Sequence, residues 1–243
     1  MTYCDNINNS YNVLYTVNQN KTNKSCKPKL NEKDVLRNSH QNSNTFKSLK
    51  SLNCISLNAR SVVNKIEEIQ TIIQIEDPDL FVCTETHLSN DILSHEIFPQ
   101  TYTVIRKDRN RHGGGLIIAY KTQLSVTPRP DLETDCEILW CEVICPDNKS
   151  LFVGVFYRPP SSSIDVINEL SKSMSLLSKS GKKTRNVILT GDFNLPRLKW
   201  QDGYIAEIDN SDLTQNMLTI IENNFLYQHV SETTRVTDST SIR

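Results

Sequence analysis

The segment Asn186–Asn194, NVILTGDFN, decides how the rest of the chain is interpreted. Its first part, 187–190, is a short apolar run rich in β-branched side chains, which predicts a buried strand. Gly191 then allows a sharp change of backbone direction. Asp192 and Asn194 follow, so the strand would hold a carboxylate and an amide at the rim of a sheet. An ordinary Asp/Asn turn after a strand is the simpler alternative, and the segment taken alone leaves both open.

Polar side chains also follow other predicted strands. Leu52–Asn58 alternates apolar and polar residues like a strand and ends at Asn58, and the apolar run 80–83 is followed closely by Glu85. A helix predicted over Ser61–Ile75 joins these two strands, and a right-handed crossover would bring both strand exits to one edge of the sheet. A third strand, 151–157, ends at Tyr157 and is followed by Arg158 and two prolines, which end ladder pairing.

Three segments have apolar residues at helical spacing: Ser61–Ile75, Ser163–Lys179 and Ser211–Asn224. Ser61 is the expected N-cap of the first helix, and either Ser211 or Asn210 that of the third. Further strands are predicted over 102–105, 116–120 and 137–145. This mixture predicts one α/β domain over residues 52–243, with two packed sheets and helices outside.

Residues 1–51 form a polar, Asn-, Ser- and Lys-rich segment that we expect to be a mostly disordered leader. Within it, only Tyr11–Val17 could make a short strand. The net charge of −1 gives no global field toward nucleic acid, so any such contact must be local. The seven cysteines include no CxxC pair and predict free thiols. No apolar run is long enough to cross a bilayer and no signal peptide is visible, so we expect an intracellular protein without membrane contact.

A charged turn, Arg106–His112, leads into Gly113–Gly115. Basic side chains beside permissive glycines could lie against a phosphodiester backbone. An ordinary solvated hairpin explains the same residues equally well.

The polar residues at the predicted strand ends are Asn58, Glu85, Tyr157, Asp192 and Asn194. Carboxylate oxygens suit Mg²⁺, which is usually held by one or two carboxylates, waters and substrate phosphate. A second carboxylate can take a proton from an attacking water, and amide or phenol groups can stabilise charge on phosphate oxygens. These residue types together predict phosphodiester hydrolysis.

Six short motifs then point to a known family. From residue 52 onward the chain resembles the endonuclease/exonuclease/phosphatase superfamily, with its deoxyribonuclease-I-like fold, and most resembles the endonuclease domain of non-LTR (LINE-type) retrotransposon polyproteins. The motifs are N-A-R-S (58–61), T-E-T-H-L (84–88), R-x-G-G-G (111–115), F-Y-R-P-P (156–160), G-D-F-N (191–194) and, less closely matched, T-T-R (233–235).

The resemblance implies a four-layer α/β/β/α sandwich and a catalytic role for each of the five strand-end residues. Glu85 would be the main ligand of Mg²⁺, or of Mn²⁺ as the alternative ion, with Asn58 and Asp192 in the same metal site. Tyr157 would hydrogen-bond the scissile phosphate, Asp192 would orient or deprotonate the attacking water, and Asn194 would hold the phosphate.

The resemblance also implies DNA as a partner, with Arg158, Thr234 and Arg235 as weaker candidates for DNA contact. A reverse transcriptase domain of a longer parent polyprotein is the second expected partner, and the protein would be nuclear when it acts.

One departure separates the candidate functions. The family continues with a strand that carries an aspartate and a later Ser-Asp-His segment, and this sequence contains neither, so we expect a sandwich that lacks its last strands. The first candidate is a metal-dependent DNA endonuclease that nicks target DNA. The alternatives are a truncated, weak or inactive remnant that at most binds nucleic acid or a partner, and a phosphatase of small phosphoesters.

Overall fold

The computed structural model describes most of the region after residue 51, together with one short strand before it. The described residues are 13–16, 52–145, 149–180, 186–201, 203–207, 209–230, 235–237 and 240–242.

The first sheet has four strands in the order β2-β3-β5-β4. β2 and β3 are parallel, and helix α1 connects them. This is the predicted strand–helix–strand unit, and it brings the ends of both strands to one edge of the sheet. The elements of this half are β2 (Cys54–Asn58), η1 (Val63–Lys65), α1 (Ile66–Glu76), β3 (Leu80–Thr84), α2 (Ser94–Ile97), β4 (Tyr102–Lys107) and β5 (Leu116–Lys121).

The second sheet has six strands in the order β12-β1-β9-β8-β7-β6. β8 and β9 are parallel and are connected by α3, so this half repeats the strand–helix–strand arrangement of the first. Its elements are β1 (Val13–Thr16), β6 (Val126–Pro128), η2 (Pro130–Leu132), β7 (Glu137–Ile144), β8 (Ser150–Tyr157), α3 (Asp165–Lys179), β9 (Asn186–Asp192), α4 (Asp212–Asn223) and β12 (Tyr227–Gln228). Two small hairpins lie outside both sheets: β10 (Lys199–Gln201) with β11 (Tyr204–Glu207), and β13 (Arg235–Thr237) with β14 (Thr240–Ile242).

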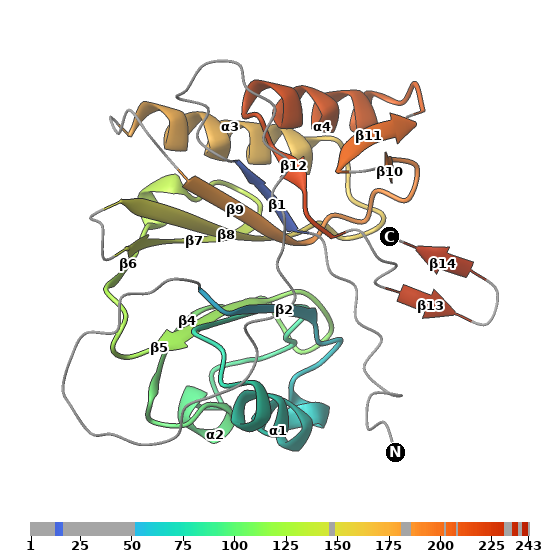
Figure 1. Cartoon of the computed structure of the whole chain (residues 1–243). Coiled ribbons are helices and arrows are strands. Elements are labelled where there is room, and N and C mark those ends of the chain that lie inside the picture. Colours follow the sequence, from blue (N-terminus) through green and yellow to red (C-terminus); the bar gives the residue numbers. More distant parts are fainter. Residues whose placement is uncertain are drawn as a thin grey trace, which may run out of the picture.

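The two sheets pack face to face, with α1 and α2 outside one and α3 and α4 outside the other (Figure 1). Alternate residues of one strand serve different cores because successive side chains point to opposite faces. On β8, Phe152 and Phe156 pack in the core that includes residues of α3 and α4, whereas Val153 and Val155 pack between the sheets. A third core lies between the four-stranded sheet and α1. The predicted four-layer α/β/β/α fold is confirmed.

The strand predicted within Tyr11–Val17 is present as β1, which pairs antiparallel with both β9 and β12. It therefore occupies the edge of β9 that faces away from β8. The other residues of the expected leader lie outside the described part of the chain, so the division at residue 52 stays a prediction.

The prediction that Ser61 caps the first long helix is wrong. Ser61 has a positive φ of 91°, its backbone N–H donates to the Glu85 carbonyl, and α1 begins only at Ile66. Residues 60–62 instead form a turn whose backbone donors bind the exit of β3. Ser211 does occupy the N-cap position of α4. Among the described residues, no helix is both long and apolar enough to span a bilayer.

Candidate active site

Asn58 and Glu85 lie together because they stand at the ends of two parallel strands, β2 and β3. Asn58 is the last residue of β2, and its register partner is Thr84, the last residue of β3. The Asn58 side-chain amide donates a 2.8 Å hydrogen bond to Glu85 Oε1.

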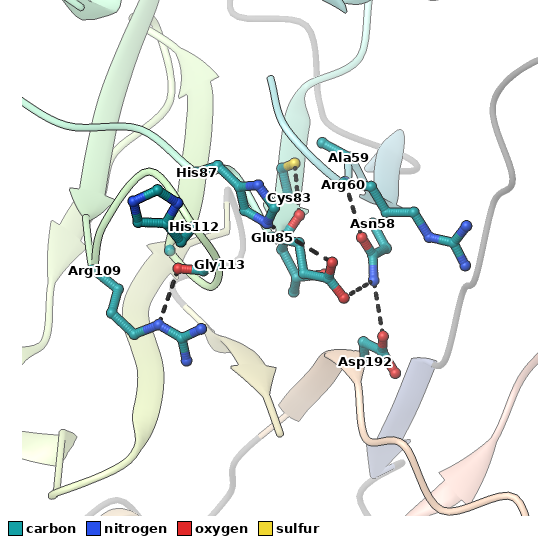
Figure 2. Close-up of polar contacts among 12 residues, drawn as sticks. Asn58, Ala59, Arg60, Cys83, Glu85, His87, Arg109, His112, Gly113 and Asp192 are labelled. Carbon is teal, nitrogen blue, oxygen red and sulfur yellow. Dashed lines mark hydrogen bonds and ion pairs between the residues drawn. The ribbon is translucent and has the colours of Figure 1, made fainter. Parts of the chain in front are cut away.

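Asp192 reaches the same place from the other sheet. It is the last residue of β9, and its Oδ2 accepts a 2.8 Å hydrogen bond from the same Asn58 amide nitrogen. Figure 2 shows this single amide between the two carboxylates. Its oxygen accepts from the Arg60 backbone N–H, so the NH₂ group is the part of Asn58 that faces the acids. The structure thus brings together three of the predicted site residues, which are up to 134 positions apart in the sequence.

The two carboxylates have no cationic lysine or arginine partner within the part of the chain that the structure describes. The nearest ionisable base is His87, whose Nε2 lies 3.9 Å from Glu85 Oε2. Burial raises the pKa of Asp192, and the charge of Glu85 raises it further, while hydrogen bonds from Asn58 and Asn194 oppose the shift. Negative charge is therefore concentrated in a largely buried place.

Tyr157 is the register partner of Asp192 across β8 and β9. Only 5% of it is exposed. Burial raises the pKa of its phenol, and the charges of Glu85 and Asp192 raise it further. Tyr157 therefore stays protonated at neutral pH and can donate a hydrogen bond.

Gly191 makes the exit of β9 possible. Its φ is +128°, and a Cβ at this position would lie 2.0 Å from the Phe156 carbonyl oxygen. A residue with a side chain cannot occupy this point without displacing β8. The glycine thus allows β9 to stay close to β8 up to the carboxylate of Asp192.

Asn194 and Arg158 bind each other's backbone carbonyls, and the Asn194 backbone N–H also donates to Asp192 Oδ1 at 3.1 Å. The Asn194 amide donates to the Arg158 carbonyl at 2.8 Å, and the Arg158 guanidinium donates to the carbonyls of Asn194, at 3.0 Å, and Ser162, at 2.9 Å. Arg158 is 3% exposed, and burial lowers its pKa. Both side chains fix the turn after β9 to the end of β8, so contact with phosphate or DNA stays a prediction for each. Thr234 lies outside the described residues, as does the side chain of Arg235 in β13, and their predicted roles likewise stay predictions.

The basic side chains of the charged turn before the triple glycine are neutralised by nearby carboxylates. Four of its basic side chains each form an ion pair with a carboxylate: Arg106 with Asp108, Lys107 with Glu133, Arg109 with Glu137, and Arg111 with Asp91. These pairs favour a structural role over direct phosphate binding.

Backbone strain is concentrated at the site. Of seven described non-glycine residues with positive φ, five belong to the turns that follow β2, β3 and β9: Arg60, Ser61, Glu85, His87 and Asn194. Such conformations are costly and persist where the surrounding structure enforces them, typically at functional sites. Arg60, Ser61 and His87 have no predicted site role, although each lies in one of the family motifs.

The donor chemistry fits a hard divalent cation. No group of three or more His, Cys, Asp or Glu side chains among the described residues could hold a metal by itself. Magnesium, however, is commonly held by one or two carboxylates and completes its shell with water and phosphate oxygens. Glu85 and Asp192, which share the Asn58 amide and have no lysine or arginine partner among the described residues, match that requirement.

Comparison with known proteins agrees with the fold. The endonuclease domain of TRAS1, a telomere-specific non-LTR retrotransposon, is 14% identical, with a TM-score of 0.53 over 71% of this chain and 72% of that chain. An AP endonuclease from Archaeoglobus fulgidus is 16% identical, with a TM-score of 0.52 over 71% of both chains. No curated protein matches at the sequence level. Residues 42–241 match the Endonuclease/Exonuclease/phosphatase family, and the chain belongs to this family.

Proposed function

We propose that this chain is a Mg²⁺-dependent endonuclease of the non-LTR retrotransposon type, which hydrolyses one phosphodiester bond in target DNA. Membership of the family makes a hydrolase of the nuclease or phosphatase type the starting point. The observation that carries the finer proposal is the amide of Asn58, which joins Glu85 and Asp192 from opposite sheets at 2.8 Å each.

Each side chain has a role that its surroundings support. Glu85 would be the main ligand of the ion, and the bound ion would polarise the phosphoryl oxygen and stabilise the leaving oxygen. Asp192, whose pKa is raised by burial, would orient the attacking water and accept its proton. Tyr157 would donate its phenolic hydrogen to a phosphate oxygen.

A plasmid-nicking assay tests the proposal. The wild-type chain with Mg²⁺ is expected to convert supercoiled DNA to the open circular form, and EDTA should stop this conversion. Glu85→Ala and Asp192→Ala should each reduce nicking by several orders of magnitude. Glu68→Ala, at an exposed acid on α1, is the matched control and should nick at the wild-type rate.

The second candidate, a chain that binds nucleic acid without cleaving it, is favoured by one observation. Among the described residues, the imidazole beside the carboxylates is His87, which faces Glu85 and has no aspartate partner. DNA binding without nicking under any divalent ion would select this candidate. Hydrolysis of p-nitrophenyl phosphate without plasmid nicking would instead select a phosphatase.

A further inference from the structure

An arginine lies over Tyr157 and is tied to the glutamate beside it. Glu137 is the register partner of Tyr157 across β7 and β8. Arg109 donates through Nη1 to Glu137, and its guanidinium carbon lies 5.8 Å from the centre of the Tyr157 ring. We call Arg109, Glu137 and Tyr157 the site-end cluster.

The same arrangement occurs at the other end of the same strand pair. Glu142 is the register partner of Phe152, and Arg129 donates to Glu142 at 2.9 Å with its guanidinium carbon 5.2 Å from the Phe152 ring centre. We call these three residues the far-end cluster. The aromatic positions of the two clusters are five residues apart on β8, roughly 17 Å along the strand. The far-end cluster therefore serves as a control. Its arginine makes the same kinds of contact away from the site, so a change there reports the effect on folding alone.

The site-end cluster also holds the glycine-rich segment. Arg109 Nε donates to the Gly113 carbonyl at 2.9 Å, a contact visible in Figure 2, and Glu137 Oε2 accepts from the Gly115 N–H at 2.8 Å. Gly114 has a φ of +68°, and a Cβ there would lie 2.4 Å from Glu137 Oε2 and 2.5 Å from Arg109 Nε. The backbone thus closes directly over the ion pair, which leaves no room for a side chain.

The segment held in this way adjoins the site. The Gly115 carbonyl accepts from the Thr86 backbone N–H, and the Gly114 carbonyl from the N–H of His87, at 3.3 and 3.0 Å. Thr86 and His87 directly follow Glu85. The Arg109–Glu137 pair therefore connects the phenol on one sheet with the Glu85 turn on the other.

We propose that Arg109 and Glu137 are positioning residues, which fix the Tyr157 phenol and the Gly113–Gly115 backbone for cleavage of the phosphodiester bond. The inference rests on the proposed function for its catalytic consequence. Because Glu137 neutralises the guanidinium, Arg109 acts through Tyr157 and the glycine backbone and does not itself bind phosphate.

Fluorine NMR tests the positioning without any need for activity. Tyrosines are replaced with 3-fluorotyrosine, and the Tyr157 resonance is identified by its absence in Tyr157→Phe. Arg109→Met is expected to shift and broaden this resonance, because the ring loses the group packed on its face. Arg129→Met should leave the resonance unchanged. An unchanged Tyr157 resonance in folded Arg109→Met would overturn the proposal, as would an equal change in Arg129→Met.

The kinetics of plasmid nicking give the second measurement. Displacing a catalytic group by about 1 Å can reduce the rate by about 100-fold. Arg109→Met should lower kcat by about that factor with little change in KM, whereas Arg129→Met should keep kcat within about twofold. In the Tyr157→Phe background, Arg109→Met should cause a clearly smaller further loss, since the part of its effect that acts through the phenolic hydroxyl is already gone and only the part that acts through the glycine backbone remains. A full additional 100-fold loss there would contradict the inference.

The two proposals fail separately. Absence of nicking by the wild-type chain refutes the proposed function, and the fluorine spectra then still decide whether Arg109 positions Tyr157. Normal nicking with an undisturbed Tyr157 resonance in Arg109→Met refutes the positioning role alone.

Discussion

Asn58→Asp is the sharpest test of the site. It keeps the shape of the side chain at residue 58 but replaces its hydrogen-bond donor with a carboxylate, which repels Glu85 and Asp192. The two 2.8 Å hydrogen bonds from the amide to Glu85 and Asp192 would become contacts between carboxylate oxygens. Two like charges about 4 Å apart repel by about 4 kcal/mol at an effective dielectric constant of 20, so the two neighbours together oppose ionisation by about 8 kcal/mol.

The new carboxyl can escape this repulsion by keeping a proton. For an ordinary aspartate with a pKa near 3.9, protonation at pH 7 costs about 4 kcal/mol, and at pH 5 about 1.5 kcal/mol. Because this cost is smaller than the repulsion, the protonated form dominates in the folded protein. The unfolded state then binds fewer protons than the folded state, so the stability of Asn58→Asp relative to wild type falls as pH rises.

Urea unfolding at pH 5 and pH 7 measures the effect. The destabilisation by Asn58→Asp should be about 2.5 kcal/mol larger at pH 7 than at pH 5. Adding Mg²⁺ at pH 7 should recover much of it, because the two charges of the ion would offset most of the repulsion among the three carboxylates. Asn64→Asp, at an exposed residue of η1, is the control and should change stability by less than about 0.5 kcal/mol at either pH. Equal destabilisation of Asn58→Asp at both pH values would refute the bridging geometry.

Three further changes have defined outcomes. Arg158→Met should lower the free energy of unfolding by about 2–4 kcal/mol in urea titrations, because it leaves the partly buried carbonyls of Asn194 and Ser162 without their donor. Asp192→Asn should abolish nicking yet raise the melting temperature at pH 7, because burial disfavours the ionised carboxylate; the gain should disappear below about pH 4, where the unfolded carboxyl is also protonated. Gly191→Ala should prevent accumulation of folded protein in expression trials, because its Cβ would lie 2.0 Å from the Phe156 carbonyl oxygen.

The positions of the central site residues could be predicted because they depend on simple geometry. Asn58 and Glu85 stand at the ends of parallel strands joined by a helix, and such strands end at one edge of a sheet. Asp192 ends β9, which is parallel to β8 and joined to it by a helix, as β3 is to β2 in the other sheet. Local sequence patterns identify such strands, and the family motifs connect the two halves.

The roles of the arginines could not be predicted in the same way. Arg158 donates to backbone carbonyls of residues 162 and 194, which carry no sequence signal of an arginine partner. Arg109 pairs with Glu137 28 positions away, so the basic turn looks free in the sequence although it is neutralised in the structure. Ser61 failed as an N-cap for a related reason, since its backbone binds the exit of β3 in preference to starting the helix.

The site and the packing of the two sheets depend on the same contacts. Below the Asn58–Asp192 hydrogen bond, Ser56 and Thr190 form a second polar contact of 2.7 Å between β2 and β9. Each partner lies two residues before its counterpart, so both contacts lie on one face of each strand. Apolar side chains alone would let the sheets slide with little change in buried area, whereas two hydrogen-bonded pairs favour one alignment. That alignment is also the one that brings Glu85 and Asp192 to a common amide, and for this reason the chemistry of the site follows from how the sheets are aligned.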